Sequence, residues 1–298
     1  MKKQRAAQVR LIPFLTFGFS LVLLPACLTS SVQAASPITG SGLNTQVSSP
    51  STLPSGKVQY DITGGTRPGG GANLFHSFGD FNVPTNNIAN FLNTPVNGVL
   101  PFTSNILARV TGTNGNNPTL SSIYGTMQTT GFGNANLFLM NPAGFLFGPN
   151  ATVNVGGMVS FTSADYLRLT DNARFNAVPG PADALLTASP VAAFGFLGSN
   201  PGAITVQGSQ FTVPEGTGIS LVGGNITVQS GVHDDGTVQS AKLSAQGGQI
   251  NIASVAGPGE ISAVDFVPTA GMTMGNISLS EGAPLDVSAD AAGRVGIR

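Results

Sequence analysis

Short runs of alternating apolar and polar residues, separated by glycine-containing turns, recur along the chain from about residue 203 onward. Alternation with a period of two predicts half-buried β-strands. Two such runs follow each other with apolar residues seven or eight positions apart, in the pairs Ile204 and Phe211, Ile219 and Ile226, Leu243 and Ile250, and Ile277 and Leu285. The pairs start 15, 24 and 34 residues apart. A propeller or leucine-rich repeat would keep a fixed period, whereas a parallel β-helix tolerates insertions because only its strands stack.

The turns before these strands suggest how the coils are joined. Gly-Gly-Asn at 223–225, Gly-Gly-Gln at 247–249 and Gly-Asn at 275–276 each precede an apolar run, and we interpret them as one recurring corner. Thr227 and Asn251 are then expected to face each other across neighbouring coils. With ~24 residues per coil, the chain after residue 34 predicts about eleven coils stacked ~4.8 Å apart, a rod of roughly 50 Å.

The segments before this repeat and at the end of the chain also show patterns that predict structure. Residues 36–55 are rich in Ser, Thr, Pro and Gly and predict an extended lead-in with one short strand, and residues 57–62 alternate as a half-buried strand. The glycines between 64 and 71 predict turns, because no Lys-Ser/Thr and helix follow to make a phosphate-binding loop. Residues 293–298 resemble the start of another coil, so we expect that the natural protein continues or that something covers this end.

The N-terminus has the order of a secretory signal peptide. Four basic residues precede an uncharged apolar run at 11–24, and small residues follow in Val32-Gln33-Ala34-Ala35. The apolar run is shorter than the ~20 residues of a membrane-spanning helix, so we expect cleavage after Ala34. Leu24-Pro25-Ala26-Cys27 leaves lipidation of Cys27 open as an alternative. Cleavage removes this only cysteine and four of the twelve basic residues, leaving eight basic against thirteen acidic residues.

Composition excludes several functions. Charged residues make up 8% of the chain, where soluble domains carry about 25%. A nucleic-acid-binding protein needs a Lys/Arg footprint, and a coiled coil needs charged flanking positions. Hydrophobic residues make up 41% of the chain, so it can bury a core, and Gly, Asn, Thr, Ser, Val and Ile favour turns and strands. The sequence therefore predicts an almost entirely β protein.

Candidate chemistry is sparse. Asp234-Asp235, between His233 and Gly236, is the only acidic doublet, and Asp-Gly is a common turn dipeptide, so we interpret it as a solvated hairpin turn. His76, the other histidine, lies in a predicted strand and is interpreted as structural. These residues offer no catalytic triad, metal site or cofactor site. Two hypotheses stay open, a non-enzymatic secretion and adhesion module and a secreted polysaccharide lyase or hydrolase on a β-helix.

Residues 73–83 (NLFHSFGDFNV) and 136–151 (NLFLMNPAGFLFGPNA) closely resemble the N-terminal secretion domain of filamentous haemagglutinin-like proteins, most strongly the cyanobacterial versions. The resemblance continues through 155–157 and 161–164 and covers roughly residues 38–228. The residues expected to form the secretion motif are Asn73, Phe75, His76, Phe78, Asn136, Asn141, Pro142, Gly144, Gly148 and Asn150. The family's Asn-Pro-Asn-Gly-Ile motif stands here as residues 141–145, with Ala143 departing from it. A β-turn is still predicted here, because Pro142 fixes φ at the second position and Gly144 can adopt a left-handed conformation.

The resemblance implies an all-β fold, a single-stranded right-handed parallel β-helix of the pectin-lyase-like type with an N-terminal β cap. It also implies an adhesin-like or haemagglutinin-like exoprotein of a two-partner secretion system. Its partner would be an outer-membrane β-barrel transporter with periplasmic recognition domains, and it would fold outside the cell. We expect a signal peptide at 1–34, a secretion domain at 35–230, further coils at 231–298, and a monomer. Glycans of a host cell or surface stay open as adhesive targets.

Overall fold

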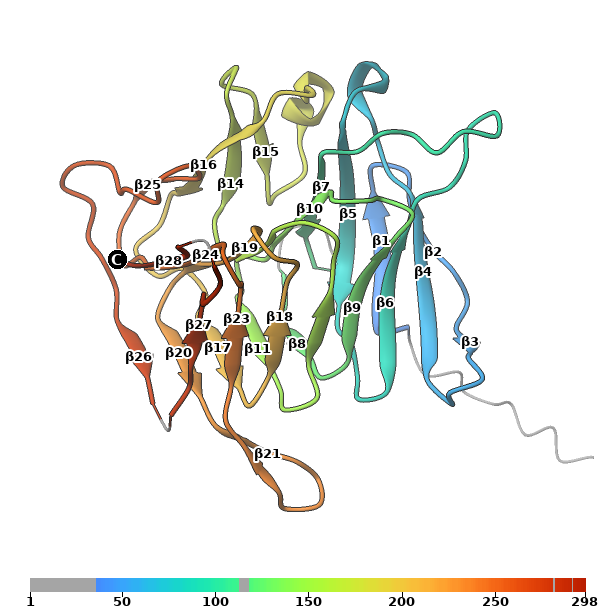
Figure 1. Ribbon diagram of the computed structural model, residues 1–298. Coiled ribbons are helices and arrows are strands. Elements are labelled where there is room, and N and C mark those ends of the chain that lie inside the picture. The colour runs from blue at the N-terminus through green and yellow to red at the C-terminus, as the bar shows by residue number, and fades with distance from the viewer. Residues whose placement is uncertain (1–35, 113–117, 281, 291) are drawn as a thin grey trace, which may run out of the picture. The chain divides into compact units, whose positions relative to one another are not determined.

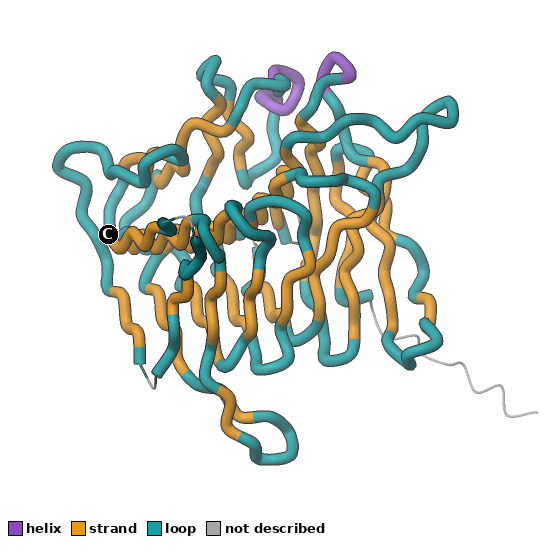
Figure 2. Tube along the Cα trace, in the orientation of Figure 1, coloured by secondary structure: helices purple, strands orange, loops and turns teal. Residues whose placement is uncertain are grey.

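Three sheets, here called A, B and C, form the faces of a parallel β-helix whose coils stack on one another (Figure 1). The computed structural model describes residues 36–112, 118–280, 282–290 and 292–298; the predicted signal peptide and Cys27 lie outside these ranges. Each complete coil runs from sheet A to sheet C to sheet B, and Figure 2 shows the strands of successive coils side by side. The predicted all-β fold, a parallel β-helix with an N-terminal β cap, is confirmed.

The strands of each sheet are given in their spatial order. Sheet A contains β1 (Ile38–Gly42), β5 (Asn73–Phe81), β7 (Asn105–Val110), β10 (Asn136–Met140), β13 (Val159–Thr162), β19 (Gly218–Gly223), β24 (Gln249–Ser254) and β28 (Arg294–Ile297). Sheet B contains β2 (Thr45–Val47), β4 (Val58–Gly64), β6 (Asn87–Leu92), β9 (Thr126–Thr130), β12 (Thr152–Asn154), β18 (Gln210–Thr212), β23 (Lys242–Ser244) and β27 (Leu285–Asp286), with β3 (Ser51–Thr52) paired to β4. Sheet C contains β26 (Ile277–Leu279), β20 (Ile226–Gln229), β17 (Ile204–Gln207), β11 (Phe145–Phe147) and β8 (Ser121–Ile123).

The N-terminal cap consists of β1, β2 and β3. β1 pairs antiparallel with β5, and β2 and β3 pair antiparallel with β4, where β4 and β5 are the first strands of the β-helix. The sequence predicted one short strand in residues 36–55, and the structure has three. β4, predicted at 57–62, is half-buried as expected. β1 and β2 are the edge strands of sheets A and B at this end, so they cover strand edges that the first coil would otherwise expose.

Apolar ladders build the interior, but the predicted strand pairs are not one recurring unit. Ile204 and Phe211 lie on sheets C and B, whereas Ile219 and Ile226 lie on sheets A and C. Ile204, Ile226 and Ile277 pair in register across sheet C, and Phe211, Leu243 and Leu285 pair across sheet B. Alternation sends every second side chain into this core. Each parallel strand of sheet A from β5 to β24 points its first inward-facing side chain into this core. These buried side chains are Leu74, Ile106, Leu137, Val159, Ile219 and Ile250.

Two further details of the predicted helix are wrong. The glycine turns are different corners: residues 223–225 and 275–276 lead into sheet C, whereas 247–249 leads into sheet A. Thr227 and Asn251 therefore lie on sheets C and A and do not face each other. The described residues also form far fewer than eleven coils, because paired positions 137 and 159 are 22 residues apart but 159 and 219 are 60 apart.

The extra residues form structures outside the helix. An antiparallel cover sheet contains β15 (Arg174–Asn176), β14 (Tyr166–Leu169), β16 (Val191–Phe196) and β25 (Gly259–Ser262), with the short 3-10 helix η2 (Pro181–Leu185) between β15 and β16. It buries a second apolar cluster against the outer face of sheet A. Another 3-10 helix, η1 (Pro68–Gly70), precedes β5. A hairpin of β21 (Gly231–Val232) and β22 (Val238–Gln239) projects between β20 and β23.

Candidate functional site

An asparagine ladder marks the start of three successive strands in sheet A. Asn105 Nδ2 donates to Asn73 Oδ1 at 2.9 Å, and Asn136 Nδ2 donates to Asn105 Oδ1 at 3.0 Å. Asn73 Nδ2 donates to the carbonyl groups of Thr187 and Ser189, while Asn136 Oδ1 accepts from the amide of Met158. The two end members of the ladder are therefore also bonded to groups outside it, which fixes the register of the coils.

The turn at residues 141–144 follows the same strand β10 at its other end. Asn141 is fully buried, and its Nδ2 donates to Thr119 O at 2.8 Å and Ser121 Oγ at 2.9 Å. Its Oδ1 accepts from the amide of Ala143 at 3.0 Å, and its carbonyl accepts from the amide of Gly144 at 2.8 Å. These bonds close a β-turn that is also tied to the preceding coil.

Gly144 has φ +92°, as the turn logic predicted. A Cβ there would lie 2.1 Å from the carbonyl oxygen of Ala203, and the amide of Phe145 donates to that same oxygen at 2.9 Å. The residue on the next coil, Gly202, donates its amide to Pro142 O at 3.0 Å. Glycine is therefore required here both by the backbone conformation and by the close stacking of coils. Ala143, where the family has asparagine, is half-exposed.

The first predicted segment divides between the two faces of β5. Phe75 points outward and packs edge-on against Phe175 of the cover sheet, with ring centroids 5.1 Å apart. His76 and Phe78 point into the helix, where both contact the ring of Phe91. Thr45 Oγ1 lies 3.3 Å from His76 Nδ1. Burial, with a smaller contribution from the charge of Arg67, lowers the pKa of His76 to about 3, so the imidazole is neutral and structural, as interpreted.

Gly148 and Asn150 lie at a third place, the corner between β11 and β12. A Cβ on Gly148 would lie 2.1 Å from the ring of Tyr124, so the glycine allows that ring to pack on the backbone. Ser209 Oγ on the next coil donates to Gly148 O at 2.8 Å. The ten predicted motif residues thus form no single site: they are distributed over the ladder, the helix interior, the cover-sheet contact and two corners.

Sequence reasoning missed two residues of this region. Asn105 is the central member of the ladder, and its signal was an asparagine before an alternating apolar run, as at Asn73 and Asn136. Arg109, 1% exposed on the outer face of β7, donates two hydrogen bonds to the carboxylate of Asp183 at 2.8 and 2.6 Å. Its guanidinium lies 5.1 Å from the centre of the Phe175 ring. This ion pair fixes η2 of the cover sheet to the helix.

The described residues show little catalytic chemistry. No group of three His, Cys, Asp or Glu side chains among them is arranged to hold a metal ion. Asp234 and Asp235 lie in the turn of the β21–β22 hairpin, where Asp235 Oδ1 accepts from the amide of Thr237 at 2.9 Å, so the turn interpretation is confirmed. No helix in the described part of the chain has the length and hydropathy to cross a membrane.

Known proteins match this architecture. A family model described as the TPS secretion domain matches residues 37–296. The crystal structure of the filamentous hemagglutinin secretion domain aligns with 16% identity and a TM-score of 0.47, covering 88% of this chain and 73% of that one. The HMW1 secretion domain from Haemophilus influenzae aligns with 15% identity and a TM-score of 0.51, covering 87% of this chain and 61% of that one.

None of the curated proteins compared with the chain matches it. The likeness to the HMW1 domain supports the β-helical fold, and the family model covers nearly all of the described coils. The chain therefore belongs to the TPS secretion domain family, the secretion domains of two-partner secretion exoproteins.

Proposed function

We propose that the protein is an adhesin-type exoprotein whose signal peptide, residues 1–34, directs it to the periplasm and is cleaved after Ala34. An outer-membrane β-barrel transporter then recognises its N-terminal region, and the chain folds outside the cell as a monomer. Membership of the secretion domain family is the observation that carries this proposal. The boundary at residue 230 between the secretion domain and the further coils stays a prediction. The cyanobacterial origin also stays a prediction.

The turn at 141–144 is the part of the motif that we propose for recognition. Asn141 and Gly144 are committed to the fold through buried hydrogen bonds and close stacking. Pro142 and Ala143 are half-exposed at the same corner, so a partner can contact them without disturbing those bonds. A fixed backbone shape with two accessible side chains suits recognition by a protein partner.

Substituting Pro142 tests this role. The protein and its transporter are co-expressed, and the fraction of chain in the medium is compared with the fraction retained in the periplasm. We expect Pro142→Ala to lower export while the exported protein loses no more than about 1 kcal/mol of stability, the ordinary effect of removing a turn proline. Pro214→Ala, at an exposed proline of another corner, is the control and should leave export unchanged. Equal export of the two variants would contradict recognition at this turn.

The alternative of a polysaccharide-active enzyme gains no support from the described side chains. The acidic doublet lies in an exposed hairpin turn, and a retaining or inverting hydrolase needs two carboxyl groups across a substrate groove. We therefore propose a non-enzymatic function. An assay for release of reducing sugars or unsaturated products from pectin-like polymers checks this, and we expect no turnover.

A further inference from the structure

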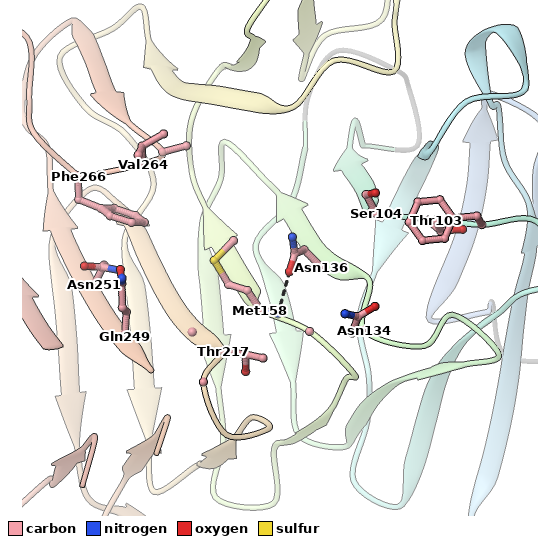
Figure 3. A pocket seen from close by; sticks show the side chains of 15 residues that line it. Thr103, Ser104, Asn134, Asn136, Met158, Thr217, Gln249, Asn251, Val264 and Phe266 are labelled. Carbon is pink, nitrogen blue, oxygen red and sulfur yellow. Dashed lines mark hydrogen bonds between the residues drawn. The ribbon is translucent and has the colours of Figure 1, made fainter. Parts of the chain in front are cut away.

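A groove of about 530 Å³ runs along the corner where successive coils enter sheet A. Figure 3 shows it from close by, with Thr103 and Ser104 toward one end and Val264 and Phe266 toward the other. Its lining includes the aromatic, thioether and amide side chains of Phe102, Asn134, Met158, Gln249, Asn251 and Phe266. None of its lining residues carries a charge or a titratable side chain. This lining suits an uncharged ligand.

Gly157, Gly216 and Gly218 line the groove where coils enter sheet A, and they leave it without side chains there. On the outer face, Phe138 of β10 is followed in register by Ser160, Ser220 and Asn251 on the next three coils. Gly218, beside Ser220, adds no side chain and pairs with Gln249. The second apolar cluster covers the sheet at Phe138 but gives way to this polar strip. Of this strip, Asn251 belongs to the lining of the groove, whereas Ser160 and Ser220 do not.

This polar strip has hydrogen-bonding capacity that the fold does not use. Ser160 and Ser220 are buried, and neither hydroxyl has a partner within the described part of the chain. Asn251 is 5% exposed, and its Nδ2 donates to Gln249 Oε1 at 3.5 Å, a long hydrogen bond and the one that this nitrogen makes within the described ranges. Buried polar groups normally have better partners. Asn251 therefore borders the groove with an amide nitrogen whose one hydrogen bond, among the described residues, is long.

Phe102 and Phe266, at opposite ends of the groove, are positioned by different contacts. Phe102 is 75% exposed, and Arg67 fixes its backbone by donating from Nη1 to Phe102 O at 3.3 Å and from Nη2 to Thr103 Oγ1 at 2.7 Å. Phe266 has φ +57°, an unusual conformation for a bulky residue. Its ring stacks on Phe194 with centroids 6.1 Å apart. The surrounding packing holds this conformation.

The groove offers side chains to a ligand but little free backbone. The amide of Asn136 donates to Ser104 O at 2.9 Å, and the amide of Gln249 donates to Thr217 O at 3.0 Å, so coil stacking already uses these groups. An extended peptide that adds a strand needs an unpaired backbone edge. A ligand that reads amide side chains with its hydroxyl groups, and rests apolar faces on Phe and Met, fits the lining better.

We propose that this groove binds a neutral oligosaccharide. A pyranose ring carries hydroxyl groups that pair with Asn and Gln amides and a C–H face that packs on aromatic and thioether groups. The absence of charged lining side chains disfavours uronates, sulfated sugars and phosphates, which need cationic partners. With no titratable group in the lining, the groove binds and does not cleave. This inference rests on the adhesive part of the proposed function and names its ligand class.

The test is titration of the purified protein with neutral oligosaccharides of glucose, galactose, mannose or xylose, followed by calorimetry or saturation-transfer NMR. Galacturonate oligomers and sulfated oligosaccharides serve as acidic counterparts. We expect at least one neutral sugar to bind. Phe102→Ala and Gln249→Ala each change an exposed side chain and should weaken that binding about fivefold to tenfold, the loss of one good contact.

Matched controls lie outside the groove. Leu197→Ala removes another exposed apolar side chain, and Gln246→Ala removes another exposed amide near the same corner; both should bind as the unchanged protein does. Binding of acidic sugars alone, of peptides alone, or of no saccharide overturns the proposal, and so does neutral-sugar binding that Phe102→Ala and Gln249→Ala leave intact. Export of all four variants at the normal level separates such a failure from failure of the secretion function.

Discussion

Replacing Gly144 by alanine isolates how much the close stacking of coils contributes to stability. The backbone there has φ +92°, and any L side chain in the left-handed region costs about 1–2 kcal/mol. The new Cβ would also lie 2.1 Å from the oxygen and 2.9 Å from the nitrogen of Ala203, both backbone atoms of the next coil. Overpacking of this kind costs a further 1–3 kcal/mol or so. We therefore expect a total loss of about 2–5 kcal/mol.

Gly236 supplies the control, because it has φ +85° and a Cβ added there would meet nothing within 4 Å. Gly236→Ala should lose only the backbone contribution, about 1–2 kcal/mol or less. The free energies of unfolding are compared by urea titration followed by circular dichroism, with the slope checked for two-state behaviour. Equal losses in the two variants would refute the idea that stacking against Ala203 demands glycine at this turn.

Three further predictions concern buried polar groups. Asn105→Ala should lower the free energy of unfolding by about 2–4 kcal/mol, since Asn73 Oδ1 and Asn136 Nδ2 both lose their ladder hydrogen bond. Asn154→Ala, at an exposed strand position, should change it by under about 0.5 kcal/mol in the same urea titration. Asp183→Ala should cost about 3 kcal/mol or more, because Arg109 stays buried without its carboxylate, and early proteolysis of η2 would report the loosened cover sheet. The pKa of His76 falls from 6.5 to about 3 on folding, so the unfolded chain alone binds this proton between those values and stability drops as pH falls. His76→Leu should remove that share, and the difference between the two proteins should change by about 1.4 kcal/mol per pH unit from pH 6 to 4; a constant difference would contradict a neutral buried imidazole.

The sequence predicted those parts of the fold that repeat. Ile204, Ile226 and Ile277 lie in strands that were predictable because alternation with Gly turns is a local pattern, but which strands stack on one another was not predicted. The number of coils was not predictable in this way, because the cover sheet interrupts the helix between β13 and β17 without interrupting the stacking. A long insertion and several short coils have the same length, and only the pairing of Val159 with Ile219 distinguishes them.

The candidate sites depend on contacts that the sequence does not place together. Asn141 and Gly144 were identifiable because one short turn holds both the side-chain acceptor and the left-handed residue. Arg109 was not, because its carboxylate partner Asp183 is far along the chain, beyond two further coils. The groove was missed for the opposite reason: it arises where side chains are small or absent, as at Gly218, and a missing side chain leaves no motif.

Transit of an unfolded chain through the transporter is a consequence of the proposed function that two serines can test. Ser160 and Ser220 are paired neighbours on β13 and β19, and their spacing of one strand, ~4.8 Å, falls in the Cα range of disulfides. Neither hydroxyl has a partner among the described residues, so Ser→Cys substitution removes no hydrogen bond there. The only natural cysteine, Cys27, lies in the predicted signal peptide, so no other thiol of the cleaved chain competes.

The double variant Ser160→Cys/Ser220→Cys closes a loop between positions 160 and 220, which includes the whole first part of the cover sheet. Formed in the oxidising periplasm, this loop should hold the chain inside the cell, and a reductant added during export should release it. Formed after export, the same bond should stabilise the folded protein by about 4 kcal/mol, because it restricts the unfolded chain. Ser160→Cys alone should be exported normally, which separates the covalent loop from the substitution. Export of the double variant at the single variant's rate, with the disulfide trapped and shown to precede transit, would mean that the chain does not cross extended. Folding of each coil outside would then have no part in driving export.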